Sequence, residues 1–200
     1  YFSAWGGVYG SILVLFTILY MLTILLMEKK DKEIYKGLSD TDALTGLLNR
    51  RAFQAAVDET LLKRISGIFI FIDVDNFKNY NDKYGHANGD LCLKHFAAAM
   101  KKCFPKDSIL GRYGGDEFVV YIKNAASDAA HRYMDEFQRE ISHLMMSGGE
   151  HVTVSASAGG VAFAGEGEDF VSLCRSADNM LYDVKRNGKG TFKMKGAKNM

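Results

Sequence analysis

Two groups of acidic residues, far apart in the sequence, each adjoin an apolar run and could hold a divalent cation. Asp73 and Asp75 follow the apolar run 68–72, which reads as a buried strand. Residues two apart on a strand share a face, so these two carboxylates could project together. Asp116 and Glu117 form the second group. Hard cations prefer carboxylate and carbonyl oxygens, so Asp73 with Asp116 or Glu117 predicts a shared metal site.

A glycine pair stands directly before the second acidic group. Gly114 and Gly115 lie between the apolar runs 109–110 and 118–122, which predicts a two-residue hairpin turn. A turn without Cβ atoms lets a large anionic ligand approach the backbone. Acids beside a phosphate need a cation between them, so the turn predicts a Mg²⁺-nucleotide site.

Residues 77–90 mix amide, acidic and basic side chains over a short stretch. Asn81 and Asp90 together offer donors and acceptors suited to a purine edge, and one carboxylate can accept both N–H groups of guanine. Taken alone, the stretch is more typical of a helix, a turn and an N-cap than of a base-binding site.

Four ordered motifs together give a specific resemblance. They are residues 42–51, 71–90, 112–118 and 177–190, and with them the chain resembles GGDEF-family diguanylate cyclases. The resemblance implies an α+β fold with a palm-like, mostly antiparallel central sheet of about five strands flanked by helices. It also implies that Asp73, the backbone carbonyl of Val74, Asp116 and Glu117 hold the metal. Asp116 and Glu117 are then the catalytic residues, with Asp116 able to take the proton from a 3′-hydroxyl.

The same resemblance assigns the substrate contacts. Asn81 and Asp90 correspond to the guanine-reading pair, and Lys189 stands where the family often has Arg, which keeps the charge but loses the forked geometry. The remaining substrate-binding positions are His86, Phe77, Lys78, Gly114, Gly115 and Lys185.

The implied reaction joins two GTP molecules into cyclic di-GMP and releases two pyrophosphates. Mg²⁺ or Mn²⁺ is the implied cofactor, because phosphoryl transfer depends on positioning and charge neutralisation. Each domain holds one GTP, so two domains must face each other in a homodimer. The family's product-binding Arg-x-x-Asp is absent, since Pro105 and Ser108 occupy its positions. Product inhibition through that site is therefore not expected.

Composition agrees with a single enzyme domain plus an appendage. Of the 200 residues, 48% are hydrophobic and the net charge is +1, which gives no reason to propose nucleic acid as a partner. Three isolated cysteines fit a reducing cytosol. The chain has no P-loop motif.

The N-terminal residues 1–27 carry no charge. Residues 8–27 would span about 30 Å as a helix, which predicts one transmembrane helix. A signal peptide is the first alternative, but the sequence lacks the charged region that a signal peptide needs. A buried helix of a globular protein is the second, but it would need a larger protein around it. Four lysines at positions 29, 30, 32 and 36 predict that the C-terminal part lies in the cytoplasm. The resemblance implies a bacterial protein, so the expected location is the inner or cell membrane, crossed once. The chain starts at Tyr1, so we expect a missing N-terminal sensor.

The expected domain organisation has three parts: residues 1–27 as the membrane helix with a short flank, 28–40 as a juxtamembrane signalling helix, and 41–195 as the GGDEF domain. Met27, Ile34 and Leu38 have the spacing of a coiled-coil seam that would join two copies, although a solvated linker fits equally well. Within the domain, helices are expected over 41–62, 89–103, 125–146 and 170–186, and a strand over 152–162.

Two further functions stay open from the sequence. One is a catalytically silent module that binds GTP or a protein partner, and the other is a different nucleotidyl cyclase acting on a single nucleotide. The presence of all the acidic and guanine-reading residues favours the diguanylate cyclase.

Overall fold

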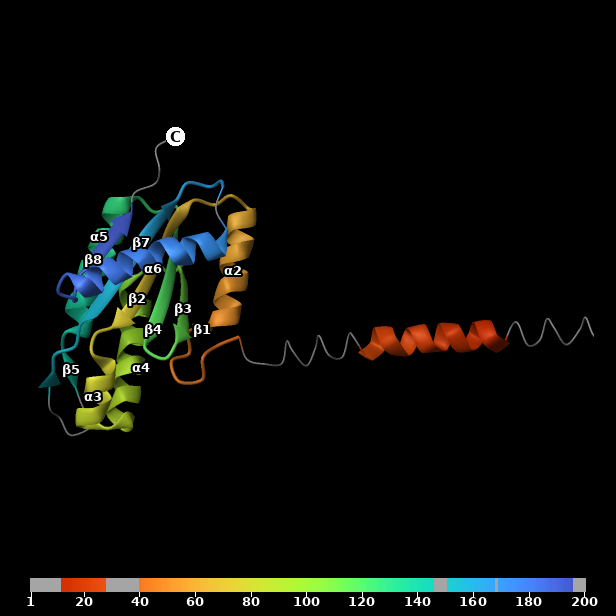
Figure 1. Ribbon diagram of the computed structural model, residues 1–200, viewed down its shortest axis with the longest axis horizontal. Coiled ribbons are helices and arrows are strands. Elements are labelled where there is room, and N and C mark those ends of the chain that lie inside the picture. The colour runs from red at the N-terminus through yellow and green to blue at the C-terminus, as the bar shows by residue number, and fades with distance from the viewer. Residues whose placement is uncertain (1–11, 28–39, 146–150, 168, 196–200) are drawn as a thin grey trace, which may run out of the picture. The chain divides into compact units, whose positions relative to one another are not determined.

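The computed structural model describes residues 12–27, 40–145, 151–167 and 169–195. The chain divides into two units, Tyr1–Ser39 and Asp40–Met200. The second unit is an α+β domain whose central six-stranded sheet is flanked by helices (Figure 1).

The helices of this domain are α2 (Arg50–Leu62), α3 (Phe77–Tyr84), α4 (His86–Cys103), α5 (Ser127–Ile141) and α6 (Phe170–Arg186). The sheet contains β1 (Leu48–Asn49), β2 (Gly67–Val74), β3 (Ile109–Gly114), β4 (Glu117–Lys123), β7 (Ala156–Phe163) and β8 (Phe192–Lys195). A separate pair is formed by β5 (Leu144–Met145) and β6 (His151–Val152).

The sheet is mixed, with the order β1-β3-β4-β2-β7-β8. The three inner pairings are antiparallel, whereas β1 pairs with β3, and β8 with β7, in parallel. The expectation of about five mostly antiparallel strands is therefore wrong, because it missed the two short parallel edge strands. The sequence run of β1 is only two residues long, too short to show a period.

The central strand β2 divides the core between the two faces of the sheet. Its even-numbered side chains, Ile68 to Val74, pack in a cluster with α4 and α5. Phe69 and Phe71 point to the opposite face and pack with α2 and α6. Figure 1 shows α6 lying across that second face. Since both faces are covered, β2 is buried throughout, which explains its apolar run over residues 68–72.

The helix over 170–186 is confirmed, and the other expected helices need shorter or shifted bounds. The helix expected over 41–62 starts only at Arg50, because residues 41–47 form turns in which Gly46 has φ +64°. The helix α4 starts three residues earlier than expected, and α5 is shorter than the expected 125–146. The strand expected over 152–162 is β7, which begins at Ala156.

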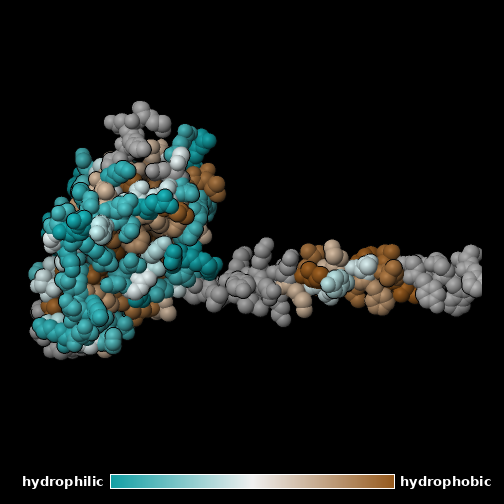
Figure 2. Space-filling view, viewed as in Figure 1, coloured by the Kyte–Doolittle hydropathy of each residue, from teal (hydrophilic) through white to brown (hydrophobic). Residues whose placement is uncertain are grey.

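The membrane helix expected over residues 8–27 is corrected by the structure. Its described part is a helix over residues 12–27, which spans about 24 Å at 1.5 Å per residue. In the described ranges, no helix combines the length and the apolar character needed to cross a membrane. Figure 2 shows hydrophobic side chains along this helix, all of them exposed. The expected membrane location stays a prediction.

The expected signalling helix lies almost entirely on residues 28–39, which are outside the described residues. Its coiled-coil seam, and the dimer contact expected through it, stay predictions.

Candidate functional site

The two acidic groups meet at one end of the sheet. Asp73, the last residue but one of β2, is the register partner of Glu117, the first residue of β4. The backbone N–H of Val74 donates to the carbonyl oxygen of Asp116 at 3.1 Å. Antiparallel pairing thus brings together Asp73, Val74, Asp116 and Glu117, although more than 40 residues of sequence separate the two groups.

Burial and neighbouring charges shift the pKa of two of these acids, Asp73 and Glu117. Burial raises the pKa of Asp73, and the neighbouring carboxylates of Asp116 and Asp75 raise it further, whereas the ammonium of Lys185 opposes the rise. Burial also raises the pKa of Glu117, with added effects from Asp73 and Asp116. Like charges held together at low solvent exposure are costly, so this end of the sheet favours a bound cation.

Lys185 provides one such cation from the last turn of α6. Its Nζ lies 2.8 Å from Oδ2 of Asp73. The resemblance implied a substrate contact for this lysine, and the structure places it beside Asp73, one of the acids that would hold the metal. It also partly offsets the raised pKa of Asp73 and Glu117.

The glycine turn differs by one residue from the expected one. The strand β3 runs to Gly114 and β4 starts at Glu117, so the turn residues are Gly115 and Asp116. Gly115 has φ +35°, and a Cβ added to it would meet nothing within 4 Å. The space above this backbone is open, as a bulky anionic ligand requires. The register shift between Arg112 and Gly114 is what moves the turn.

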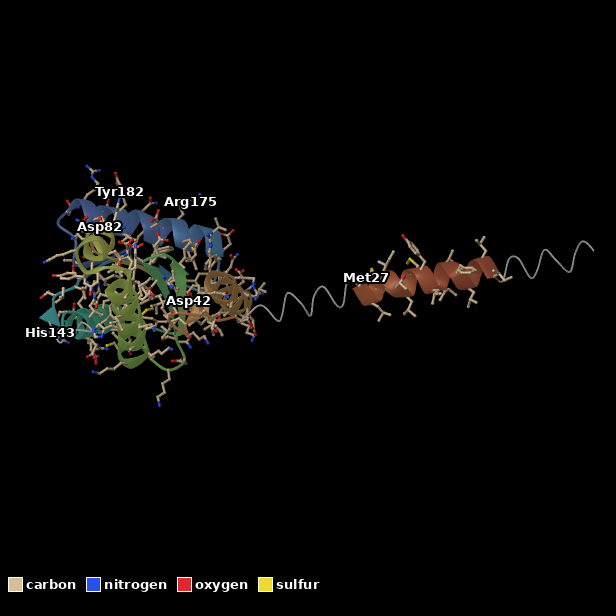
Figure 3. The ribbon with its side chains drawn as sticks, turned by 90° about the horizontal axis from the view of Figure 1, so that it is seen from below. Met27, Asp42, Asp82, His143, Arg175 and Tyr182 are labelled. Carbon is tan, nitrogen blue, oxygen red and sulfur yellow. The ribbon has the colours of Figure 1, made fainter. Side chains whose placement is uncertain are left out.

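Arg112 connects this turn to the start of the domain. Its guanidinium donates to the carbonyl oxygen of Gly115 at 2.7 and 3.0 Å and to Asp42 at 3.1 Å. Figure 3 labels Asp42, which lies in the loop before α2. The Asp42 carboxylate also accepts hydrogen bonds from the amide and the hydroxyl of Thr45. Sequence analysis assigned no role to this link, since only folding brings positions 42 and 112 together.

The expected guanine-reading residues lie on α3 and α4. The Oδ1 atom of Asn81 is buried without a hydrogen-bond partner, and it lies against Gly89, where an added Cβ would be 1.8 Å away. Asp90 follows Gly89 directly and is exposed. The absence of a side chain at position 89 therefore lets Asn81 lie directly against α4 at Gly89.

The remaining expected substrate residues have separate positions. His86 is exposed at the start of α4, and Lys78 is exposed on α3. Phe77 packs against the core and stacks with Tyr80 at a centroid distance of 6.4 Å. The Nζ of Lys189 donates to Oδ1 of Asn76 at 2.8 Å, close to the end of β2.

Asp75 was expected to project together with Asp73, but the structure directs its side chain elsewhere. Its carboxylate accepts hydrogen bonds from the hydroxyls of Ser155 and Ser157, each at 2.6 Å. It also accepts from the backbone N–H of Gly190 at 3.0 Å. The spacing of two that suggested a shared face ends with the strand at Val74. The alternation of Ser155 and Ser157 was the sequence signal for these partners.

The acids suit a divalent cation by their chemistry. Among the described residues, no group of three or more His, Cys, Asp or Glu side chains is arranged so that it could hold a metal ion. The donor types nevertheless suit Mg²⁺ or Mn²⁺, since Asp73, Asp116 and Glu117 carry hard carboxylate oxygens. Burial, together with neighbouring carboxylates, raises the pKa of Asp73 and of Glu117, so a cation there would relieve the cost of their charges. Such an ion would be held by these three residues and the carbonyl of Val74.

Comparisons with known proteins match the domain that contains this site. The family model described as "Diguanylate cyclase, GGDEF domain" matches residues 39–191. A Vibrio cholerae protein named Diguanylate cyclase is 34% identical over 164 residues, covering 79% of this chain and 50% of that protein. Cyclic di-GMP phosphodiesterase PdeR of Escherichia coli K12 is 33% identical over 168 residues, covering 82% of this chain and 25% of that protein.

A solved structure gives the same fold. The GGDEF domain of DgcB from Caulobacter crescentus, in complex with c-di-GMP, has a TM-score of 0.72 and 29% identity, covering 78% of this chain and 92% of that chain. The chain spans between a quarter and a half of the length of the two curated relatives.

Proposed function

Because the chain belongs to the GGDEF family of diguanylate cyclase domains, we propose that it joins two GTP molecules into cyclic di-GMP and releases two pyrophosphates. The observation that carries this proposal is the register pairing of Asp73 with Glu117, which brings three acids together beside the open turn at Gly115. Carboxylates beside open backbone and a lysine suit metal-assisted phosphoryl transfer.

The residues of the site have different roles in phosphoryl transfer. Lys185 and Lys189 neutralise phosphate charge, and the bare turn at Gly115 admits the triphosphate. Asp116 accepts the proton of the attacking 3′-hydroxyl, whose oxygen forms a bond to the α-phosphorus of the second GTP as pyrophosphate leaves. Mg²⁺ or Mn²⁺, held by Asp73, the Val74 carbonyl, Asp116 and Glu117, would polarise the phosphate and lower the pKa of that hydroxyl.

Base recognition follows from the α3–α4 pair. The buried Oδ1 of Asn81 leaves its amide N–H₂ as the group that can reach the base. Asp90 is an exposed acceptor suited to the N1–H and N2–H of guanine. One donor and one acceptor together select guanine over adenine, which lacks that donor pair.

The reaction requires two domains that face each other. One domain offers one such site, while each ring-closing attack joins two nucleotides. A homodimer of these domains is therefore part of the proposal, with control by a sensor in the rest of the protein.

The second candidate is a GTP-binding or protein-binding module without turnover. The similarity to PdeR, which is named as a phosphodiesterase, favours this alternative, because a domain of this family also occurs in a protein named for another activity. The Asp73–Lys185 ion pair, which occupies a metal-binding carboxylate, is consistent with it as well.

The deciding experiment incubates the chain with GTP and Mg²⁺ over a range of protein concentrations and quantifies cyclic di-GMP and pyrophosphate. We expect product to rise more steeply than linearly with protein. Asp116→Ala should abolish turnover, whereas Asp107→Ala, an exposed acid outside the site, should leave it unchanged. Bound GTP without product at every concentration, even in an artificially joined dimer, would establish the binding module instead.

A further inference from the structure

Asp75 is the centre of a hydrogen-bonded group that we call the Asp75 clasp, comprising Asp75, Ser155, Ser157 and Gly190. Asp75 is only 9% exposed. Oδ1 accepts from Ser157 Oγ at 2.6 Å, and Oδ2 accepts from Ser155 Oγ at 2.6 Å and from the Gly190 N–H at 3.0 Å. A buried carboxylate needs such partners, and each charge-assisted bond is stronger than a neutral one.

The clasp joins three segments that are distant in sequence. The backbone N–H of Asp75 donates to the carbonyl of Ser155 at 2.9 Å, which fixes the end of β2 against the start of β7. The Gly190 N–H is shared between Asp75 and the Ser157 hydroxyl at 3.3 Å. The third segment is therefore the turn after α6, whose backbone the clasp fixes at Gly190.

That turn has an unusual backbone. Gly188, Lys189 and Gly190 have φ values of +117°, +62° and +64°. The left-handed region is free for glycine, but a lysine is strained there because its Cβ crowds the backbone. A conformation of this kind persists only where the surroundings impose it. The clasp on Gly190 and the hydrogen bond from the Lys189 N–H to the Val184 carbonyl at 3.2 Å are what impose it here.

The side chain of Lys189 returns to the same end of β2. Its Nζ donates to Oδ1 of Asn76, the residue next to Asp75, at 2.8 Å. Asn76 is itself left-handed, with φ +56°. Asp75 thus fixes both the backbone that carries Lys189 and the chain that carries its hydrogen-bond acceptor Asn76, three residues from Asp73.

We propose that Asp75 is a positioning residue for Lys189, and that it acts on the triphosphate of GTP through that lysine without touching nucleotide or metal. This inference rests on the proposed function, since it takes the anionic partner of Lys189 to be the substrate. Both Asp75 oxygens are already occupied by donors, which separates its role from that of Asp73. The clasp removes the freedom of a long side chain that would otherwise have to be ordered on binding.

The test is a double-mutant cycle on the chain with Asp75→Asn, Lys189→Ala and both together. The readout is the affinity, in the presence of Mg²⁺, for a GTP analogue with a methylene bridge between the α- and β-phosphates. We expect each single variant to weaken binding about tenfold, and the double variant to bind no more weakly than Lys189→Ala alone. GMP, which lacks the outer phosphates, should bind all four proteins equally.

A second readout follows the clasp without nucleotide. Hydrogen exchange at the Gly190 amide should accelerate in Asp75→Asn, because its acceptor is weakened. Ser157→Ala and Ser155→Ala keep the carboxylate and serve if Asp75→Asn does not fold. Asp169→Asn is the matched control, since Asp169 caps α6 by accepting from the Ser172 amide at 2.8 Å and lies outside the clasp. It should lower the melting temperature without coupling to Lys189.

Additive losses in the cycle, or equal weakening of GMP and of the analogue, would overturn the positioning role and leave Asp75 as a purely structural residue. If the unmodified chain binds no guanine nucleotide while Gly190 exchange still depends on Asp75, the proposed function fails and the inference fails with it. If the chain binds the analogue but Asp75 and Lys189 show no coupling, the inference is rejected and the proposed function stands.

Discussion

At the scale of single residues, the surroundings lower the pKa of one carboxyl group of this domain, Asp42, and raise that of another, Glu117. Burial alone would raise the pKa of Asp42, but hydrogen bonds from Thr45 and the guanidinium of Arg112 outweigh it and lower that pKa below 3.8. Glu117 has acids as neighbours, and its pKa is raised. The first arrangement stabilises the folded chain, whereas the second costs stability and prepares a site for cations.

Asp42→Asn should destabilise the domain by about 1–2 kcal/mol at neutral pH, because a half-buried charge-assisted network is lost. A lowered pKa means that the folded state binds the proton less readily than the unfolded chain. The stabilisation is thus complete above pH 3.8 and disappears as pH falls through the lower folded-state value. Urea unfolding at several pH values checks this, and a loss that persisted unchanged in acid would contradict it.

Glu117→Gln should raise stability while removing activity. Without divalent cations, loss of one of the crowded charges should add up to about 1 kcal/mol, in line with the usual trade-off at functional sites. Turnover should fall by about a hundredfold or more, since a charge at the reacting phosphates is lost. Calorimetry in a chelator and the cyclic di-GMP assay give the two values. Glu136→Gln, an exposed glutamate on α5, is the control, and a lower melting temperature for Glu117→Gln alone would refute the crowding argument.

At the scale of elements, the close approach of α3 and α4 depends on Gly89. An added Cβ would lie 1.8 Å from Oδ1 and 2.9 Å from Cγ of Asn81, and 3.3 Å from the ring of Phe77. Helix interiors favour alanine over glycine by about 1 kcal/mol. The glycine at this position thus lowers helix stability, and it lets Asn81 keep its orientation.

Gly89→Ala should therefore turn the Asn81 side chain away and raise the KM for GTP about tenfold. The melting temperature should change little, because the higher helix propensity of alanine offsets the stability lost at the contact with Asn81. Steady-state kinetics and thermal unfolding measure the two effects. In the Asn81→Ala background the same substitution should have no further effect on KM. An additional loss there would mean that Gly89 acts on the substrate by another route.

At the scale of the whole molecule, the absence of Arg-x-x-Asp at positions 105 and 108 bears on regulation. Cyclic di-GMP added to the assay should leave the initial rate unchanged, since no guanidinium grips the product there. Pro105→Arg combined with Ser108→Asp should introduce inhibition, lowering the rate about tenfold at saturating product. Pro105→Ala with Ser108→Ala is the control. Inhibition of the unmodified chain would point to a different product site.

The sequence was sufficient where chemistry and spacing are local. The sequence alone predicted the apolar run of β2, the acids that follow it and the motif around Gly114. It also predicted the helix over 170–186 with its observed bounds. Predictions failed where the outcome depended on partners. The sequence predicted a helix over residues 41–47, but these residues form turns. The hydrogen bonds of Asp42 with Thr45 and Arg112 compete with helical ones, and a local pattern does not show them.

What the sequence by itself determined is the set of groups that can do chemistry and the strand that carries the first of them. What only the tertiary structure decided is which groups share a site. Asp73 and Asp75 are two residues apart, yet the first meets Glu117 and Lys185 whereas the second is held by Ser155, Ser157 and Gly190. Strand register and the left-handed turn at Lys189 make that division, and both follow from contacts between segments far apart in the chain, which no local pattern encodes.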